Sequence, residues 1–583
     1  MTSQAEQQPE RTGLKSLAYR YVPILGWLPE YQRANLMPDA LAALTVWALL
    51  VPEAMAYATI AGVPPEAGLY AAILPLFLYA IFGTSRQLSV GPSSTVAILS
   101  AATIAPLVDD TEDFIALTAA LAILVGVILV VSGIARMGWV STFMAKTVLE
   151  GFVIGLAMVV LIGQADKLFG VTAEGDNFWE EAWDLINSLG DAHLETTVIG
   201  VGSLVLLFGL GRFVPKAPGA LITVFLGIAV SAALNLEDEG VHIVGEIPSG
   251  LPPFGRPDGI SLSDIQSLLP GALGIVLVAY AESLAVASSY ASKHKYKVDS
   301  NQELIGLGWS NIGAGMSQGF VVNGSLSRTA AADSAGQKTQ MSALINGAFV
   351  IITVLALTAL FNDLPEAVLG AIVIHAVWHL IDFEKLYKMY KVSQPDFAVA
   401  MICMLGVLTV DILAGLLIAV AVSLLVLVFK ASRPSLPVLG RDPEKNVYRS
   451  IERHPESETY PGLIIFRLDA ELFFANATYF RDRLGEQRVI ADPPARAILV
   501  DAEAITDMDL TAAAMLKELT SELAAEGIEL LFAVVHQTVR EMMERSGVED
   551  AIGADHIYPT VQDGVDYFLA QRPEAGQENG DDE

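Results

Sequence analysis

Two similar stretches of sequence decide how this chain folds: Ser89-Val90-Gly91-Pro92-Ser93-Ser94-Thr95 and Val322-Asn323-Gly324-Ser325-Leu326-Ser327-Arg328-Thr329. Each stretch is extended and apolar, contains a glycine, and leads through serine or threonine into a helix of small residues. Glycine permits a bend in the backbone, and Ser or Thr can cap the exposed amides of a helix. The helices that follow, 93–107 and 326–334, are too short to cross a bilayer alone, since a spanning helix needs about 20 apolar residues.

Long apolar runs make up most of the first 430 residues. The chain has 583 residues, of which 53% are hydrophobic and 17% charged, whereas an average globular chain carries roughly 25% charged residues. We predict a polytopic α-helical membrane protein with fourteen transmembrane segments. The predicted segments are residues 39–60, 66–83, 93–107, 114–134, 147–169, 194–212, 218–235, 270–291, 302–317, 326–334, 340–361, 364–380, 396–412 and 414–430.

The charges of the connecting loops support these segments. Cytoplasmic loops of membrane proteins are enriched in Lys and Arg, and alternate loops of this chain hold such residues, while the loops between them are acidic or uncharged. The basic loop residues are Arg86, Arg136, Lys146, Arg212, Lys216, Lys293, Lys295, Lys297, Lys338, Lys385, Lys388, Lys391, Lys430 and Arg433. We therefore expect a multi-pass protein of the cell membrane with both termini in the cytoplasm. A large soluble helical protein would not alternate its loop charges in this way.

The two short helices occupy the same place in the two halves of the membrane part. Seven segments precede the long acidic loop (39–235) and seven follow it (264–430), and an odd number of segments inverts the second half relative to the first. Short or glycine-interrupted segments at matching positions indicate a transporter site at the membrane midplane. Their N-termini would aim amides and positive dipole ends at an anion. The alternative is a pair of ordinary short helices or re-entrant plugs. The candidate binding residues at these N-termini are Ser93, Ser94, Leu326 and Ser327.

Ionisable residues within membrane segments are costly and usually functional. Arg328 opens the second short helix, and its permanently charged guanidinium presents a fork of donors that suits a small oxyanion. Glu282 lies in the middle of a segment, and a buried carboxylate can take up a proton. Glu282 is therefore a candidate for coupling anion transport to protons. The alternative for Glu282 and Arg328 is a buried ion pair that only fixes packing.

A second acidic residue lies in the middle of the first segment. Glu53 follows Pro52 and is a further candidate proton site. Its alternative roles are to satisfy the backbone groups that Pro52 frees, or to face a wet cavity. Tyr57, one helical turn further on, can donate its hydroxyl to an anion or serve as a packing aromatic.

Composition and spacing exclude several other classes of protein. The net charge of −31 argues against nucleic-acid binding, which requires a basic surface. The single cysteine, Cys403, excludes a disulfide framework and cysteine-based metal sites. His375 and His379 have a spacing that can bind a metal, but no third ligand is evident. We expect no metal site, no cofactor and no enzymatic activity, because no catalytic constellation is present.

A small α/β domain is expected after the membrane part. Residues 431–440 are typical of a linker, and strand and helix patterns alternate through 441–571, as in a domain with a parallel sheet. Residues 572–583 are polar and acidic and are expected to be disordered, and 1–38 form a polar N-terminal segment. The expected strands are 462–468, 497–501 and 528–535, and the expected helices are 476–484, 509–526, 537–546 and 561–570.

Several motifs of the chain resemble those of the sulfate permease (SulP) anion transporters, whose animal relatives form solute carrier family 26. The motifs are Pro52-Glu53-Ala54-Met55-Ala56-Tyr57-Ala58, Ala61-Gly62-Val63-Pro64-Pro65-Glu66-Ala67-Gly68-Leu69-Tyr70, Phe82-Gly83-Thr84-Ser85-Arg86-Gln87-Leu88-Ser89-Val90-Gly91-Pro92 and Asn323-Gly324-Ser325-Leu326-Ser327-Arg328. Residues 441–571 resemble the STAS domain, which is shared with bacterial anti-sigma-factor antagonists. The resemblance covers nearly the whole chain past residue 20.

The resemblance implies a seven-plus-seven inverted repeat in which a core domain moves against a gate domain, usually within a homodimer. It places the anion between the short helices that begin near Ser93 and Leu326, beside Ser327 and Arg328. It also matches Tyr57 to a tyrosine in the first segment of the family.

The resemblance also bears on the coupling ion. Glu282 matches an acid that is tied to proton coupling in plant-type sulfate transporters. Sodium-coupled bicarbonate members carry an aspartate there and a hydroxyl one turn later, where this chain has Val286. Many sulfate members have glutamine in place of Glu53. In the STAS domain, Thr511 matches the phosphorylated serine of the antagonist proteins; its alternative is an unmodified threonine at a helix N-terminus.

These expectations favour a secondary active transporter that takes up a small oxyanion, most simply sulfate, with protons by alternating access at a midplane site. The alternatives are sodium-coupled bicarbonate uptake, proton-coupled dicarboxylate uptake, and an anion exchanger or channel. A different class is a membrane-anchored regulatory protein that acts through its STAS domain on a cytoplasmic protein partner. The two short helices with Arg328 and Glu282 favour transport, because an anchor would not need them.

Overall fold

The computed structural model divides the chain into two units, Met1–Ser423 and Leu424–Glu583, which are described separately. The described residues are 19, 21–108, 111–139, 146–173, 175, 177–214, 217–378, 380–410, 412–445 and 447–571. The expected disordered tail, 572–583, lies outside the described residues, as do residues 1–18 and 20 of the expected N-terminal segment and the basic loop residue Lys216.

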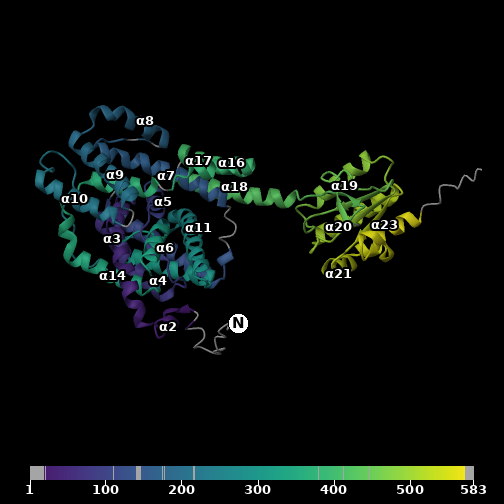
Figure 1. The fold of residues 1–583 in the computed structure, drawn as a ribbon, viewed down its shortest axis with the longest axis horizontal. Coiled ribbons are helices and arrows are strands. Elements are labelled where there is room, and N and C mark those ends of the chain that lie inside the picture. Colours follow the sequence, from purple (N-terminus) through teal and green to yellow (C-terminus); the bar gives the residue numbers. More distant parts are fainter. Residues whose placement is uncertain are drawn as a thin grey trace, which may run out of the picture. The chain divides into compact units, whose positions relative to one another are not determined.

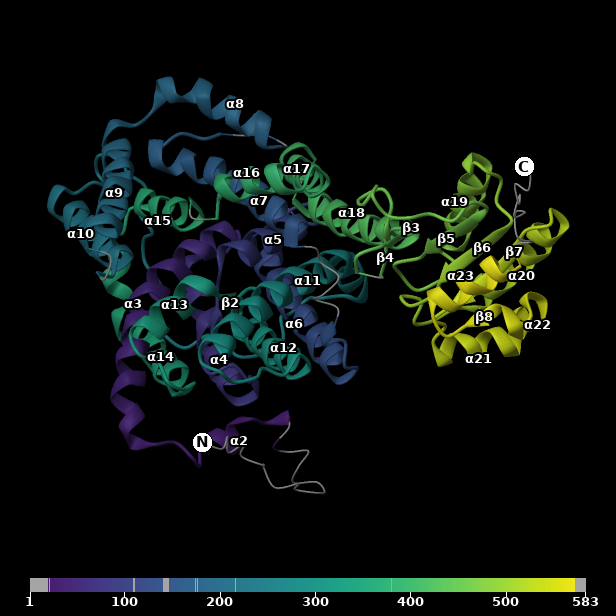
Figure 2. The ribbon, with the colours of Figure 1, turned by 45° about the vertical axis from the view of Figure 1, so that its right-hand side comes forward.

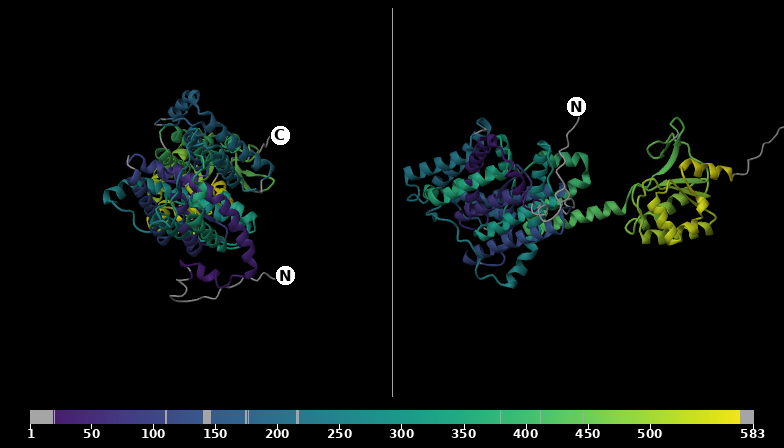
Figure 3. Two further views of the ribbon diagram at one scale, coloured as in Figure 1. Left: turned by 90° about the vertical axis from the view of Figure 1, so that its left-hand side faces the viewer. Right: turned by 90° about the horizontal axis from the view of Figure 1, so that it is seen from below.

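The first unit is a bundle of helices (Figure 1). Within its described residues and the start of the second unit, eight helices are long and apolar enough to cross a membrane, and four shorter apolar helices accompany them. The bundle confirms the expected polytopic helical fold, while the count of fourteen segments stays a prediction. The right-hand view of Figure 3 shows that many of the long helices run roughly parallel to one another.

The elements of this part of the chain follow in order. They are α2 (Ile24–Trp27), η1 (Arg33–Asn35), α3 (Leu36–Ile60), α4 (Pro65–Phe82), β1 (Ser89–Gly91), α5 (Ser94–Ile104), α6 (Thr111–Ile134), α7 (Lys146–Phe169), α8 (Phe178–Ser188), η3 (Leu189–Asp191), α9 (Leu194–Phe213), α10 (Gly219–Leu234), α11 (Leu262–Lys293), α12 (Ser300–Met316), β2 (Asn323–Ser325), α13 (Leu326–Ser334), α14 (Met341–Ile352), η4 (Thr353–Leu357), η5 (Thr358–Phe361), α15 (Glu366–Trp378), α16 (Phe383–Val392), α17 (Gln394–Thr409) and α18 (Ile412–Ser432).

Glycines allow the helices that carry the site to pack closely. A Cβ built on Gly68 of α4 would lie 1.9 Å from the carbonyl oxygen of Ala54 in α3, so only glycine fits at this crossing. Gly126 of α6 and Gly308 of α12 face each other in the same way, with Cβ-to-carbonyl distances of 2.6 and 2.7 Å. Small residues at such crossings are the usual means of helix packing in membranes. Figure 2 shows α4, α6 and α12 gathered in one region of the bundle.

Two helices lie between the segments expected from hydropathy. The first, α8, lies in the long acidic loop, and Asn177 caps it by accepting the amide N–H groups of Trp179 and Glu180. The second, α16, buries Leu386 and exposes Phe383 and Tyr387. Both helices are short and apolar on one side only, so a search for long apolar runs passes over them.

The second unit contains a six-stranded mixed sheet with strand order β4-β3-β5-β6-β7-β8. β3 and β4 form an antiparallel hairpin, and β5 to β8 are parallel, as the sequence indicates. β3 begins within the stretch 431–440 that reads as a linker. The elements are β3 (Val438–Asp442), β4 (Val447–Ser450), β5 (Leu463–Arg467), α19 (Ala477–Ile490), β6 (Ala497–Asp501), α20 (Leu510–Ala525), β7 (Glu529–Ala533), α21 (Gln537–Ser546), α22 (Val548–Ile552), η6 (Ala554–His556), β8 (Ile557–Tyr558) and α23 (Val561–Ala570).

The sheet of the second unit is buried on both faces. Along β6, Ile498 and Val500 belong to one apolar cluster and Leu499 to another, as the alternation of side chains along a strand requires. The first cluster packs against α20 through Leu516, and the second against α23 through Val565. The alternation explains why this strand reads as a continuous apolar run in the sequence.

Asp501, at the end of β6, yields a testable stability prediction. Burial raises the pKa of its carboxyl, although the amide N–H of Glu503 donates to it at 3.2 Å. Because the folded-state pKa lies above the unfolded one, the protonated form stabilises the fold below the unfolded pKa, and this stabilisation is lost as the pH rises through the folded pKa. We expect Asp501→Asn to raise the unfolding midpoint of this unit at pH 7 and to flatten its dependence on mildly acidic pH. Thermal unfolding of the full chain between pH 4 and 8 measures both, and an unchanged pH profile would contradict the prediction.

Candidate functional site

The two stretches that open the short helices come together as a small antiparallel sheet. β1 pairs with β2 in the register Ser89 with Ser325, Val90 with Gly324, and Gly91 with Asn323. These residues are separated by more than 230 positions in sequence, and all are buried. The pairing therefore brings the N-termini of α5 and α13 into one place, as the matching sequence positions indicate.

At the first of these N-termini, α5 begins at Ser94 with Ser93 in the N-cap position. Ser93 makes no capping hydrogen bond, and its hydroxyl instead donates to Oδ1 of Asn323 at 2.6 Å. The first amides of a helix have no partner within the helix. The N-terminus of α5 is thus left without its usual side-chain cap and keeps amides available to a ligand.

At the second N-terminus, α13 begins at Leu326 and is capped by Ser325, whose hydroxyl accepts the amide of Arg328 at 3.4 Å. The side chains of the first turn separate by environment: Leu326 is 61% exposed and Ser327 is also exposed, whereas Arg328 is fully buried. Thr329 ties the two half-sites together, because its hydroxyl accepts the amide N–H of Ser89 at 3.0 Å.

The buried guanidinium of Arg328 pairs with Glu53. Nη1 of Arg328 lies 3.2 Å from Oε2 of Glu53, which α3 places in the interior just after Pro52. The sequence left open a buried ion pair between Glu282 and Arg328 that only fixes packing. The structure pairs Arg328 with Glu53 instead. The alternative of a Glu282–Arg328 ion pair is therefore wrong, because α11 directs Glu282 toward Asn323.

Arg328 retains unused donors. Its Nε and Nη2 are buried and have no hydrogen-bond partner among the described residues. A Cβ built on Gly91 would lie 3.5 Å from Nη2, so the guanidinium lies against β1. An unpaired buried donor of a charged group is costly unless a ligand satisfies it. The arrangement can bind a small anion that accepts from Nε and Nη2.

Glu282 belongs to a second set of contacts at the same site. Its Oε2 accepts from Nδ2 of Asn323 at 2.7 Å, and Thr95 of α5 lies close enough to interact with it. Asn323 thus bridges Glu282 to Ser93. In this way the acid on α11 contacts both half-site entrances but does not touch Arg328.

Tyr57 lies one turn from Glu53 on α3 and is nearly fully buried. It is close enough to interact electrostatically with both Glu53 and Arg328. The structure thus groups Tyr57 with the predicted residues Glu53 and Arg328, and groups Glu282 with Ser93.

Three polar residues of the site were not among those predicted. Asn323 and Thr95 lie in the quoted motifs, and their roles as partners of Glu282 depend on the pairing of β1 with β2. Glu303 of α12 is fully buried and accepts from the Tyr79 hydroxyl at 2.6 Å and from the Thr84 hydroxyl at 2.6 Å. Glu303 fixes the turn that leads into β1. Its position after the cap residue Asp299 made it look like an ordinary residue of a first helical turn.

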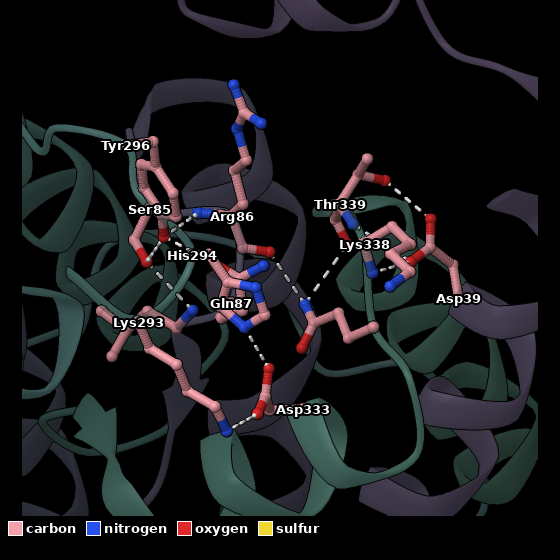
Figure 4. A network of polar contacts seen from close by, with 12 residues as sticks. Asp39, Ser85, Arg86, Gln87, Lys293, His294, Tyr296, Asp333, Lys338 and Thr339 are labelled. Atoms are coloured by element: carbon pink, nitrogen blue, oxygen red, sulfur yellow. Dashed lines mark hydrogen bonds and ion pairs between the residues drawn. The ribbon is translucent and has the colours of Figure 1, made fainter. Parts of the chain in front are cut away.

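Other residues considered in the sequence lie apart from this site. Asp333, at the end of α13, accepts from Lys293 at 2.6 Å and is paired with His294 at 2.5 Å (Figure 4). His375 stacks edge-on against Phe208, while His379 lies outside the described residues. Among the described residues, no group of three His, Cys, Asp or Glu side chains could hold a metal ion. In the second unit, Thr511 is the exposed second residue of α20.

Comparison with known proteins decides the family. The model of the sulfate permease family matches residues 36–403, which include all the elements of the site. The chain belongs to the sulfate permease family. Its STAS domain is matched over residues 454–564, in agreement with the sheet of the second unit.

Relatives of this sulfate permease family member extend over nearly the whole chain. It is 38% identical over 552 residues to the "Probable sulfate transporter Rv1739c" of Mycobacterium tuberculosis, covering 93% of this chain and 98% of that protein. It is 32% identical over 570 residues to "Sulfate transporter 4.1, chloroplastic" of Arabidopsis thaliana, covering 94% and 82%. Its fold is similar to that of the murine solute carrier 26 family member A9 anion transporter in the inward-facing state, with a TM-score of 0.87, 25% identity and 97% of each chain covered.

Proposed function

We propose that the chain is a secondary active transporter that takes up a small inorganic oxyanion, most simply sulfate, together with protons. The observation that carries the proposal is the fully buried Arg328, with two unpaired donors, beside the N-terminus of α5. A guanidinium and unpaired helix amides suit a doubly charged tetrahedral oxyanion, because they offer several fixed donors and a positive field. Relatives named as sulfate transporters support the choice of sulfate.

Glu53 links anion binding to protonation in this proposal. Its carboxylate already occupies one face of Arg328 at 3.2 Å, so a second anion at Nε and Nη2 would lie close to a like charge. Protonation of Glu53 removes this repulsion and weakens its hold on Arg328. The anion is therefore bound best when Glu53 carries a proton, which is the condition for carrying both in one cycle.

Glu282 serves as a second proton-coupling residue in this scheme. Because it accepts from Asn323, which in turn accepts from Ser93, its charge state acts on the entrance of α5. The proposed substrate site consists of Tyr57, Ser93, Ser94, Leu326, Ser327 and Arg328. A pair of half-sites on opposite sides of one sheet is well placed for alternating access at the midplane.

The remaining parts of the proposal concern the whole protein. We place both termini and the STAS domain in the cytoplasm of a cell-membrane protein, because the basic loops alternate with acidic ones. The membrane part is proposed as a seven-plus-seven inverted repeat over 39–430 within a homodimer. The STAS domain is proposed to bind a cytoplasmic protein, with Thr511 as its phosphorylation site.

Uptake into liposomes that contain the purified protein tests the proposal. We expect labelled sulfate to accumulate when the interior is alkaline, and the accumulation to collapse when a protonophore removes the pH gradient. Liposomes without protein provide the control, and unlabelled bicarbonate and fumarate provide the competitors. Sulfate accumulation driven by a sodium gradient alone would contradict the proposal. Transport of bicarbonate or fumarate in preference to sulfate would contradict it as well.

A further inference from the structure

A small cavity lies beside the first residue of β1, between α13 and α14. Elements α3, α4, β1, α13 and α14 contribute to its walls, and its volume of ≈ 10 Å³ leaves room for about one water molecule. Its polar lining residues are Ser89, Gln337, Gln340, Ser342 and Asn346. None of these residues belongs to the proposed anion site.

Three of the lining side chains present oxygens without a donor. Oε1 of Gln337, Oε1 of Gln340 and Oδ1 of Asn346 are buried and have no hydrogen-bond partner among the described residues. The large majority of buried polar side-chain atoms in proteins are paired. Three unpaired oxygens in residues that line one cavity indicate a ligand that is attracted to oxygen.

The two glutamine amides are fixed in orientation. Nε2 of Gln340 donates to the carbonyl oxygens of Ser85 and Leu88, each at 2.9 Å. Nε2 of Gln337 donates to the carbonyls of Arg86 and Thr339, at 3.1 and 3.2 Å. Exchanging nitrogen and oxygen in either amide would set an acceptor against two acceptors. Both Oε1 atoms must therefore remain as acceptors for something in the cavity.

The number of hydrogens favours a cation over water when Asn346 has the amide orientation that the structure records. One water molecule offers two hydrogens, which in that orientation leaves at least one of the three oxygens unpaired, and the cavity has room for only about one such molecule. The hydroxyls of Ser89 and Ser342 do not donate to these oxygens. A hard cation, by contrast, can be coordinated by several oxygens at once. Because the amide ligands are neutral, they match a singly charged cation.

The local field also favours positive charge. Asp39 of α3 is fully buried and accepts the amides of Lys338 and Thr339, at 2.7 and 3.1 Å, together with the Thr339 hydroxyl (Figure 4). It makes no ion pair in the described part of the chain, and the loop it holds joins Gln337 directly to Gln340. The cavity is also lined by Ala332, near the C-terminal, negative end of the α13 dipole.

We propose that this cavity binds one dehydrated alkali cation through the amide oxygens of Gln337, Gln340 and Asn346. The cation would join β1, α13 and α14 and hold the short helix in place. The proposed site is separate from Glu282 and goes beyond the proton-coupled transport proposed above.

Thermal unfolding of the purified full chain tests this proposal. The midpoint is compared in NaCl, KCl and N-methyl-D-glucamine chloride at one ionic strength, so that chloride and screening are constant. A cation that binds only the folded state raises the midpoint in proportion to the logarithm of its excess over the dissociation constant. We expect a saturable rise of several degrees in sodium or potassium. Equal midpoints in all three salts would mean that the cavity holds water only, and would overturn the proposal.

Variants at Asn346 assign the effect to the cavity. Asn346→Leu should remove the cation-dependent rise, and Asn346→Asp should enlarge it by supplying a charged oxygen ligand. Gln164→Leu is the matched control, because Oε1 of Gln164 is also buried and unpaired but lies on α7, outside the cavity lining. Arg328→Ala should keep the rise, which separates this site from the anion site. A cation-dependent rise that persists unchanged in Asn346→Leu would overturn the assignment. If that variant does not fold, a rise in Asn346→Asp no larger than that of the unaltered protein would overturn it.

Discussion

Arg328→Ala is expected to abolish sulfate uptake and to weaken sulfate binding by at least roughly 100-fold, since each hydrogen bond to a charged group contributes about 1.5–3 kcal/mol and two such donors are lost. The donors are Nε and Nη2, which are buried and unpaired. Among the described residues, Arg328 is the one Lys or Arg paired with Glu53, and Glu282 is paired with none. Isothermal titration with sulfate and liposome uptake measure the two effects.

Arg328→Ala is also expected to lower the stability of the fold. Removing Arg328 leaves Glu53 as an uncompensated charge in the interior, which typically destabilises a protein by about 3–5 kcal/mol. The double variant Glu53→Gln with Arg328→Ala removes that charge and should recover most of the stability without recovering transport. A folded single or double variant that still binds sulfate like the unaltered protein would refute the role of Arg328.

Arg328→Lys distinguishes charge from geometry. Lysine keeps the positive charge but presents a single ammonium in place of a planar fork of donors. It can stay paired with Glu53 and retain the fold, yet it cannot offer the donors now supplied by Nε and Nη2 at their positions. We expect this variant to fold like the unaltered protein. It should bind sulfate more weakly than the unaltered protein but more tightly than Arg328→Ala.

The sequence was sufficient to locate the two half-sites but not their contacts. The glycine, the serine or threonine and the small residues at 89–95 and 322–329 are local signals of a helix that begins after an extended segment, and α5 and α13 begin there. The pairing of Glu53 with Arg328 joins residues 275 positions apart. Nothing local distinguishes Glu53 from Glu282 as the partner, because the choice depends on how α3 and α11 pack around β1 and β2.

The cavity beside β1 could not be predicted from the sequence either. Gln337, Gln340 and Asn346 follow α13 in sequence and look like ordinary polar residues near a helix end. Their oxygens become significant only because the carbonyls of Ser85 and Leu88 engage the amide nitrogen of Gln340. Periodicity and hydropathy predict which residues are buried, but they do not predict which buried polar atoms lack partners.

Glu53→Gln is expected to uncouple sulfate transport from the proton gradient. The amide oxygen of glutamine can still accept from Nη1 of Arg328, and the side chain has nearly the same size, so the fold should be retained. The substituted side chain neither carries a negative charge nor takes up a proton. Sulfate affinity at neutral pH should therefore rise, its dependence on pH should flatten, and accumulation driven by an alkaline interior should be lost while sulfate–sulfate exchange continues.

Glu282→Gln is the matched comparison, because its carboxylate contacts Asn323 rather than Arg328. We expect Glu282→Gln to reduce gradient-driven accumulation but to leave the pH dependence of sulfate affinity in place. The measurements are sulfate binding between pH 5 and 8, counterflow exchange, and uptake under an imposed pH gradient, for each variant in the same liposomes. Gradient-driven accumulation by Glu53→Gln at the level of the unaltered protein would show that protons are not coupled through the carboxylate that competes with the anion for Arg328.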